Sequence, residues 1–278
     1  MQSRKIKANN LNSSILHSLQ MKIKNVWKNS KKRFMNSLFL KSILLIQKNK
    51  KTLFYIFLFD VLFLASLYGI QTLFRYVPPL GNFWFGILLS IAYFFILVFV
   101  YSFFKYIVLE YVVLFAKDKR KGKLKEFFIL NLLIFAPLLF VMLLINIILV
   151  FSLKTNYLPL ISSIISMVIA FFLYPFINFS HSLFAQGKKW KKSLVNSLNF
   201  TFKRIKSYLP VYGFGVVVFL LLYAVFNLIW LVLRFTIPEY SLNSVFDVFT
   251  NVYSVISMIL LYKIILFNRF YFYLITKK

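Results

Sequence analysis

Ionisable side chains within long apolar runs are the residues of this sequence that could carry chemistry. Asp60 lies about nine residues, or roughly 13 Å along a helix, inside the apolar run 52–74. A carboxylate at that depth is costly, and such groups are usually functional or paired. The hypothesis for Asp60 is a proton or cation site. The alternative is a neutral or paired carboxyl that fixes helix packing.

Two lysines also lie within apolar runs. Lys105 and Lys263 are each about 20 residues from the outer end of their run. From there a lysine can extend its ammonium group to the inner interface, so anchoring is the expected role. A pair between Asp60 and Lys263 is also geometrically feasible. Asp60, Lys263 and Lys105 together form the candidate intramembrane polar site.

A second group of ionisable residues lies near the corresponding inner ends of every second apolar run. Glu110, His181 and Arg269 make up this group, and they form a candidate inner vestibule if the run ends cluster. Surface residues on helix ends are the alternative interpretation.

Several kinds of chemistry lack their residues. The chain has no cysteine and two histidines, so thiolate chemistry is absent and a multi-histidine metal centre is not expected. Its six acidic residues are scattered singly, which does not indicate catalysis by a carboxylate pair. Phosphate-binding loops and nucleophile elbows do not occur either. The sequence predicts no catalytic, metal or cofactor site, and enzymatic activity is a disfavoured alternative.

The elements that must position these residues are membrane-spanning helices. The chain is 61% hydrophobic and 21% aromatic, which is far more apolar than a soluble domain. Six continuous runs reach the roughly 20 residues that a helix needs to cross the hydrocarbon layer. They are 52–74, 83–104, 127–153, 158–184, 208–233 and 245–275. We expect an all-α integral membrane bundle, with a basic N-terminal region, 1–51, before the six-helix domain, 52–278.

The basic residues give this domain an orientation. Of the 34 Lys and Arg residues, 29 lie on one side of the six spans, and Arg75, Lys154 and Arg234 lie on the other. Basic loops are retained on the cytoplasmic side when helices insert. The expected protein is a multi-pass cell-membrane protein with both termini in the cytoplasm.

Similar segments recur at the ends of the spans. Leu-Phe-Ala occurs at 114–116 and 183–185, and Asn-Ser-Leu precedes spans at 36–38 and 196–198. Three helical hairpins, each crossing the membrane and returning, would produce such matches.

Two basic segments beside the spans have amphipathic spacing. In 13–28 apolar residues recur every four positions, and in 188–207 Trp190, Leu194, Leu198 and Phe202 do so. Such helices lie in the membrane interface, so anionic lipid headgroups are the expected partners. Segment 34–46 is apolar nearly all round and is either interfacial or packed on the bundle. A protein partner or homo-oligomer stays open, and nucleic acid is not expected.

The stretch KKSLVNSL at 191–198, followed by FKRIK at 202–206 and then a span, resembles a known group. It is similar to the multi-span membrane domain fused to some bacterial glycerophosphodiester phosphodiesterases and to its stand-alone prokaryotic relatives of unknown function. The phosphodiesterase domain itself has no counterpart here. The resemblance therefore implies a membrane module and transfers no catalytic residue.

Three functions follow from these features. The leading hypothesis is a non-enzymatic membrane module that organises lipid or partner proteins. A small-solute or ion transporter using Asp60 is the first alternative, and a membrane-embedded lipid enzyme is the second. A water-filled cavity at Asp60 would favour transport, and an exposed apolar groove would favour binding. Polar residues that converge at one depth would favour the enzyme.

Overall fold

The computed structural model describes residues 38–48, 50–76, 83–116, 122–152 and 157–277. The chain divides into two compact units, Met1–Lys48 and Asn49–Lys278. In the first unit the described part is helix α2, Leu38–Lys48, which covers most of the apolar segment expected over 34–46. The amphipathic helix expected over 13–28 lies outside the described residues.

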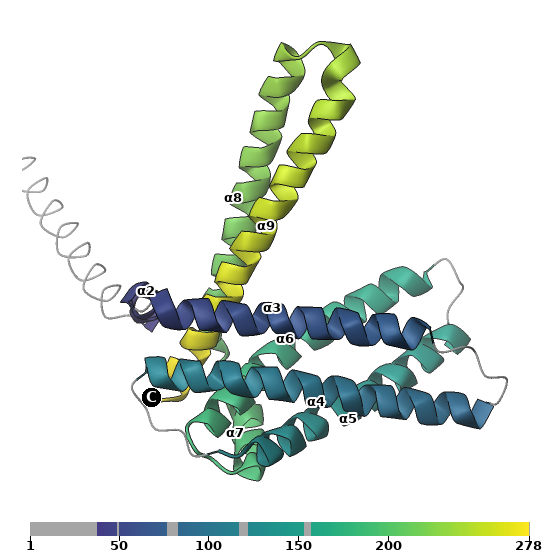
Figure 1. The fold of residues 1–278 in the computed structure, drawn as a ribbon, viewed down its shortest axis with the longest axis vertical. Coiled ribbons are helices and arrows are strands. Elements are labelled where there is room, and N and C mark those ends of the chain that lie inside the picture. Colours follow the sequence, from purple (N-terminus) through teal and green to yellow (C-terminus); the bar gives the residue numbers. More distant parts are fainter. Residues whose placement is uncertain (1–37, 49, 77–82, 117–121, 153–156, 278) are drawn as a thin grey trace, which may run out of the picture. The chain divides into compact units, whose positions relative to one another are not determined.

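The second unit is built from helices throughout its described part (Figure 1). The helices are α3 (Lys50–Arg75), α4 (Phe83–Phe115), α5 (Leu124–Ser152), α6 (Leu158–Ala185), α7 (Trp190–Lys203), α8 (Ile205–Thr236) and α9 (Glu239–Thr276). All except α7 are long and apolar enough to cross a membrane, which makes six candidate spans within the described residues. The predicted all-α class with six long apolar helices is confirmed.

The helices are longer than the apolar runs predicted them to be. Helix α4 has 33 residues and continues from position 104 to Phe115, because Lys105 and Glu110 interrupt the apolar run without interrupting the helix. At 1.5 Å per residue α4 is about 50 Å long, against roughly 30 Å of hydrocarbon. Its last turns, which follow Lys105 and include Glu110, can therefore extend beyond the hydrocarbon layer while its centre spans it.

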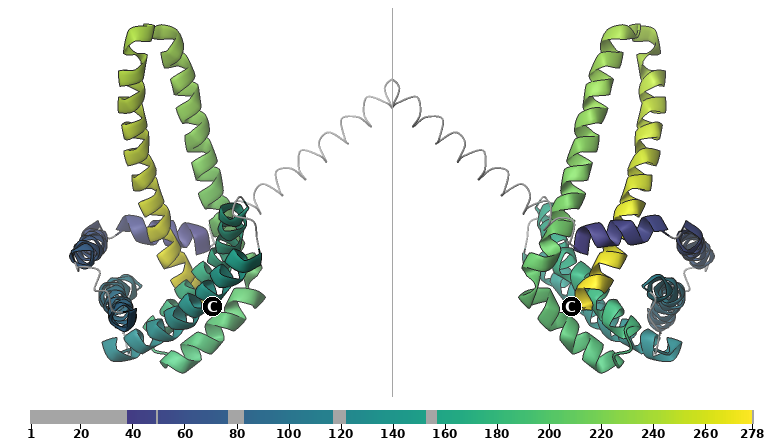
Figure 2. Two further views of the ribbon diagram at one scale, coloured as in Figure 1. Left: turned by 90° about the vertical axis from the view of Figure 1, so that its right-hand side faces the viewer. Right: turned by 90° about the vertical axis from the view of Figure 1, so that its left-hand side faces the viewer.

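Neighbouring helices pack in pairs along the chain. Helix α3 packs on α4, α5 on α6, and α8 on α9, as three hairpins require. Figures 1 and 2 show α8 and α9 running side by side from their connection. Contacts between α4 and α5 and between α6 and α9 join the successive pairs.

Buried side chains concentrate at one end of these helices, which we call the basic end because it adjoins the basic segments 117–125 and 188–206. At this end the residues from Phe179 to Ala185 of α6 are all buried, and so are most residues of the last three turns of α9. Toward the opposite ends most apolar side chains are exposed. An exposed apolar surface on a spanning helix is the surface that lipid tails cover.

The turn between α6 and α7 has a glycine for a specific reason. Gly187 has φ 88°, a left-handed conformation that favours glycine. Its N–H donates to the carbonyl of Phe184 at 2.9 Å, and the N–H of Lys188 donates to that of Leu183 at 3.1 Å. These bonds form a Schellman motif, which ends α6 and turns the chain sharply into α7.

Candidate functional site

Asp60 of α3 forms an ion pair with Arg269 of α9. The two guanidinium nitrogens donate to the two carboxylate oxygens, Nη1 to Oδ2 at 2.5 Å and Nη2 to Oδ1 at 2.9 Å. Tyr262 donates a further hydrogen bond to Oδ2 at 3.1 Å. Both charged side chains are largely buried, with 17% of Asp60 and 13% of Arg269 exposed. This paired geometry is strong and directional, and it ties the second half of α9 to α3.

This ion pair joins Asp60 to a residue of the other predicted site, Arg269, and not to Lys263. Lys105 of α4 lies close enough to Asp60 and Arg269 to interact with both electrostatically. Lys263 is exposed, and the partner of Asp60 is Arg269 instead. Glu110 lies five residues beyond Lys105, which places it on a different face of α4.

A chain of buried hydrogen bonds joins three further helices. Asn131 of α5 donates from Nδ2 to Oγ of Ser102 on α4 at 2.9 Å, and its Oδ1 lies 2.7 Å from Nε2 of His181 on α6. Because the amide nitrogen is used by Ser102, the amide oxygen faces His181, and Nε2 carries the proton. All three side chains are buried.

This chain differs from a nucleophile and its base. Catalytic pairs place the hydroxyl directly against the imidazole. Here Asn131 lies between Ser102 and His181, and the Ser102 hydroxyl donates to the carbonyl of Val98 at 2.6 Å. The hydroxyl is therefore occupied by a bond within α4. The chain of hydrogen bonds holds α4, α5 and α6 together.

Together these side chains form what we call the polar cluster. Asn268 of α9 joins it by donating to the hydroxyl of Tyr174 on α6 at 2.8 Å. The cluster consists of Asp60, Lys105, Asn131, Tyr174, His181, Asn268 and Arg269. Among the described residues no group of three His, Asp or Glu side chains could hold a metal ion.

Polar residues from five helices thus converge at a similar depth. Counted along their helices, Lys105, His181 and Arg269 lie roughly 6 to 15 Å from the basic end. Since the helices are longer than the hydrocarbon layer is thick, this depth is close to one membrane boundary. Convergence of polar residues at one depth was expected to favour an enzyme. Here these residues bond to one another, and the bonds hold neighbouring helices together.

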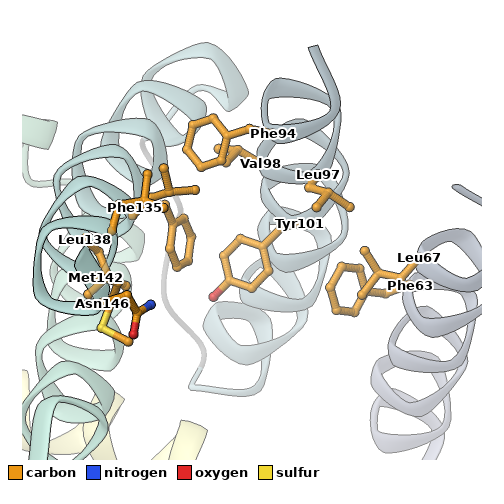
Figure 3. A pocket seen from close by; sticks show the side chains of 12 residues that line it. Phe63, Leu67, Phe94, Leu97, Val98, Tyr101, Phe135, Leu138, Met142 and Asn146 are labelled. Atoms are coloured by element: carbon orange, nitrogen blue, oxygen red, sulfur yellow. The ribbon is translucent and has the colours of Figure 1, made fainter. Parts of the chain in front are cut away.

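An open apolar groove of about 490 Å³ lies between α3, α4 and α5 (Figure 3). Phe63 and Leu67 line it from α3, and α4 and α5 supply the other walls. Nearly all of the lining is aliphatic or aromatic, and the exceptions are the hydroxyl of Tyr101 and the amide of Asn146. Its volume is that of a typical small-ligand site.

Tyr101 connects the groove to the polar cluster. In Figure 3 its ring lies between the side chains of α3 and those of α5. Its centroid is 5.9 Å from that of Phe63, 5.2 Å from that of Phe135 and 6.0 Å from that of His181. One face of the site is therefore apolar, and the polar cluster begins where the groove ends toward the basic end.

Helix α7 packs on α6 through small hydroxyl side chains. Ser193, Ser197 and Thr201 are its buried residues, and Ser180 of α6 donates to Ser197 at 2.6 Å. The predicted apolar stripe had Leu198 and Phe202 on one side with Trp190 and Leu194. In the structure Leu198 and Phe202 are exposed, by 45% and 61%, although the ring of Phe202 lies 5.9 Å from that of Phe172 on α6. Small residues every four positions were the overlooked packing signal.

Other site residues were also missed, and one left a signal in the sequence. Tyr262 precedes Arg269 by seven residues, which places both on the same face of α9. A search for polar residues at helical spacing from Arg269 would have found it. The part played by Tyr101 depends on contacts between helices and left no comparable pattern.

No protein-family model matches the chain, and no curated protein and no solved structure matches it either.

Proposed function

We propose that this multi-span membrane protein binds and organises membrane lipid without catalysing a reaction of its own. The observation that carries the proposal is the groove between α3, α4 and α5, which is apolar, open and lined along the membrane-spanning part of all three helices. Inside a bilayer the molecules that can fill such a groove are other helices and lipid chains. A second helix would need a surface shaped to fit the groove, whereas a flexible acyl chain does not. We therefore propose that an acyl chain occupies the groove.

The arrangement of Asp60 favours lipid binding over transport. Its two oxygens already accept three hydrogen bonds, two from Arg269 and one from Tyr262. A proton or cation site needs carboxylate oxygens that can exchange partners during a cycle. The ion pair is better suited to holding α9 against α3 and thereby keeping the groove walls in place.

Helix α7 supplies a second lipid contact in this proposal. Its exposed apolar residues Leu198 and Phe202 would enter the hydrocarbon boundary, and Lys192 and Lys203 would reach anionic headgroups. The basic end would then face the cytoplasm of a cell membrane, as basic loops do. The family resemblance of segment 191–206 is part of the same proposal, because it implies a membrane module.

Photocrosslinking tests the groove directly. The full-length protein is reconstituted with a phospholipid that carries a diazirine on its acyl chain, purified in detergent, washed, irradiated and digested. Crosslinks mapped by mass spectrometry are expected on the groove residues of α3, α4 and α5. Replacing Leu97 by tryptophan fills the groove and is expected to remove most of them, whereas the same change at Leu221 on α8 is the matched control.

Exposed residues of the hairpin α8–α9 are the control that distinguishes lipid binding in the groove from general exposure to lipid. Leu221 is 61% exposed and Met258 of α9 is 67% exposed, and neither lines the groove. If crosslinks simply follow exposure, these helices will carry most of them, and the proposal fails. A homodimer that covers the groove would also contradict it, because disulfide crosslinking between cysteines introduced at the groove, or mass analysis, would then find a second copy where lipid is expected.

A further inference from the structure

The groove between α3, α4 and α5 contains two polar side chains without a hydrogen-bond partner. Tyr101 and Asn146 line it, and neither side chain forms a hydrogen bond within the part of the chain that the structure describes. By contrast, Asn178 and Asn227 each donate to the carbonyl four residues earlier in their own helix, at 2.8 and 2.7 Å. Asn146 is exposed, so its amide is open to whatever fills the groove. Because an amide that faces hydrocarbon without a partner is costly, the occupant is expected to supply a polar atom.

The two polar side chains lie at different depths. Tyr101 lies near the middle of α4, as Phe63 does in α3 and Phe135 in α5. Asn146 lies in the last turns of α5, toward the end opposite the basic end. The ring of Phe135 lies 5.2 Å from that of Tyr101, and Asn146 lies roughly 16 Å further along α5 by helical rise. The groove therefore runs from the middle of the membrane to the boundary opposite the basic end.

These positions give the groove the depth of one lipid leaflet. The hydrocarbon layer is roughly 30 Å thick, so each leaflet contributes about 15 Å, close to the length of the groove. The ester carbonyls of a glycerolipid lie at the hydrocarbon boundary, and the methyl ends of its chains lie near the middle of the bilayer. Asn146 is therefore at the depth of the esters, and Tyr101 is not. The lipid that fits belongs to the leaflet opposite the basic end, which we call the far leaflet.

We propose that the groove holds one acyl chain of a glycerolipid from the far leaflet, and that the amide nitrogen of Asn146 donates a hydrogen bond to the ester carbonyl of that chain. This inference rests on the proposed lipid-binding function and adds the leaflet and the chemical group that is recognised. An amide N–H donates and an ester carbonyl accepts, so the bond satisfies the exposed amide. The methyl end of the chain lies beside the ring of Tyr101. The headgroup stays outside the groove, so phosphatidylcholine serves as the probe.

The position of a photoreactive label along the acyl chain tests the orientation of the lipid in the unaltered protein. Two phosphatidylcholines are reconstituted separately with the full-length protein, one with a diazirine near the ester and one with a diazirine near the methyl end. The first is expected to label α5 around Asn146, and the second to label the groove around Tyr101 and Phe135. The reverse pattern would mean that the lipid belongs to the leaflet at the basic end, and it would overturn the inference.

Ether lipids test the hydrogen bond. A diether phosphatidylcholine has the same chains as the diester lipid but no ester carbonyl. It should therefore compete about fivefold less well for the groove, the effect of one neutral hydrogen bond. Competition is measured as the loss of groove labelling by the lipid with a diazirine near the methyl end. In Asn146→Leu the two competitors should be equally effective, and a variant that keeps the advantage of the diester would overturn the role of Asn146.

Two other variants are the matched controls. Tyr101→Phe removes the hydroxyl at the deep end of the groove, and Asn227→Leu removes an amide that bonds within α8. Both variants should keep the advantage of the diester lipid. Its loss in Tyr101→Phe would place the ester near the middle of the membrane, and its loss in Asn227→Leu would show that the effect is not specific to the groove. Either result would overturn the inference.

The labelling pattern distinguishes failure of this inference from failure of the proposed function. Labels concentrated in the groove, together with equal competition by the diester and diether lipids in the unaltered protein, would overturn the ester contact alone. Labels that follow exposure along all spans, without concentration in the groove, would remove the proposed function as well.

Discussion

The two halves of α9 are alike in composition and opposite in packing. From Ile264 to Thr276 nearly every side chain is buried, whereas none of residues 244–263 is buried. Both stretches are rich in Ile, Leu, Phe and Tyr and both belong to one apolar span. Hydrophobicity alone therefore does not determine which part of the helix packs.

Polar contacts separate the two halves. In the buried half Arg269 bonds to Asp60, Asn268 bonds to Tyr174, and Gln186 donates to the hydroxyl of Thr276 at 2.7 Å. In the exposed half Tyr262, at the inner end, still donates to Asp60, and the remainder is held to α8 by rings. Phe226 lies 4.4 Å from Phe249 and Trp230 lies 4.7 Å from Phe246, between centroids.

Lipid tails are as apolar as the side chains they touch, so burying an aliphatic side chain between two helices gains little in a membrane. Hydrogen bonds and ion pairs keep their value there, because a polar group that faces hydrocarbon stays unsatisfied. The comparison within α9 teaches that the polar cluster determines where this protein packs. The variants below remove contacts either from the polar cluster and its neighbours or from the exposed hairpin α8–α9, and each has a control at an exposed position.

Replacing Asp60 by leucine should have the largest effect. It leaves the guanidinium of Arg269 buried without its carboxylate, and breaking a buried ion pair from one side costs about 3–5 kcal/mol. The free energy of unfolding, measured by denaturant titration in mixed micelles, should fall by that amount. Asp247→Leu, which removes an exposed carboxylate from the other half of α9, should change it by no more than about 0.5 kcal/mol.

A double variant distinguishes lost pairing from general damage. Replacing Arg269 as well as Asp60 by leucine removes the orphaned charge, so the double variant should be more stable than Asp60→Leu alone. If it is less stable, the ion pair is not what couples α3 to α9.

Asn131→Leu should have an intermediate effect. It leaves Nε2 of His181 without its acceptor in a buried site, which costs about 1–3 kcal/mol. Asn227→Leu is the matched control, because Asn227 is an exposed asparagine of α8 that bonds to the carbonyl of Tyr223 in its own helix. Unfolding titrations that give both variants the same loss would contradict a special role for the buried chain.

The extent of each helix followed from the sequence more readily than its partners did. The six spans are visible as apolar runs, because each run is set by local composition and the thickness of hydrocarbon. Asp60 was a candidate for the same local reason. Its partner could not be deduced, since Arg269 lies 209 residues away and several cations occupy similar depths.

The groove and the packed face of α7 were hidden for a related reason. Groove residues such as Phe63 and Met142 look like any other apolar residues of a span until three helices are brought together. On α7 the larger apolar residues drew attention away from Ser193 and Ser197, although small residues allow the closest approach between helices. In a membrane protein the small and polar positions are the more informative guide to packing.

The smallest predicted effect concerns the exposed half of the hairpin. In Phe226→Ala lipid tails replace the lost ring, so mainly the aromatic contacts with Phe249 and Tyr253 are lost, about 0.5–1.5 kcal/mol. Hydrogen exchange should quicken in the outer turns of α8 and α9 and stay unchanged at residues 264–276. Phe235→Ala, at an exposed position, should quicken neither. Faster exchange around Arg269 in the Phe226 variant would mean that the halves of α9 form one cooperative unit, against the independence that their different packing predicts.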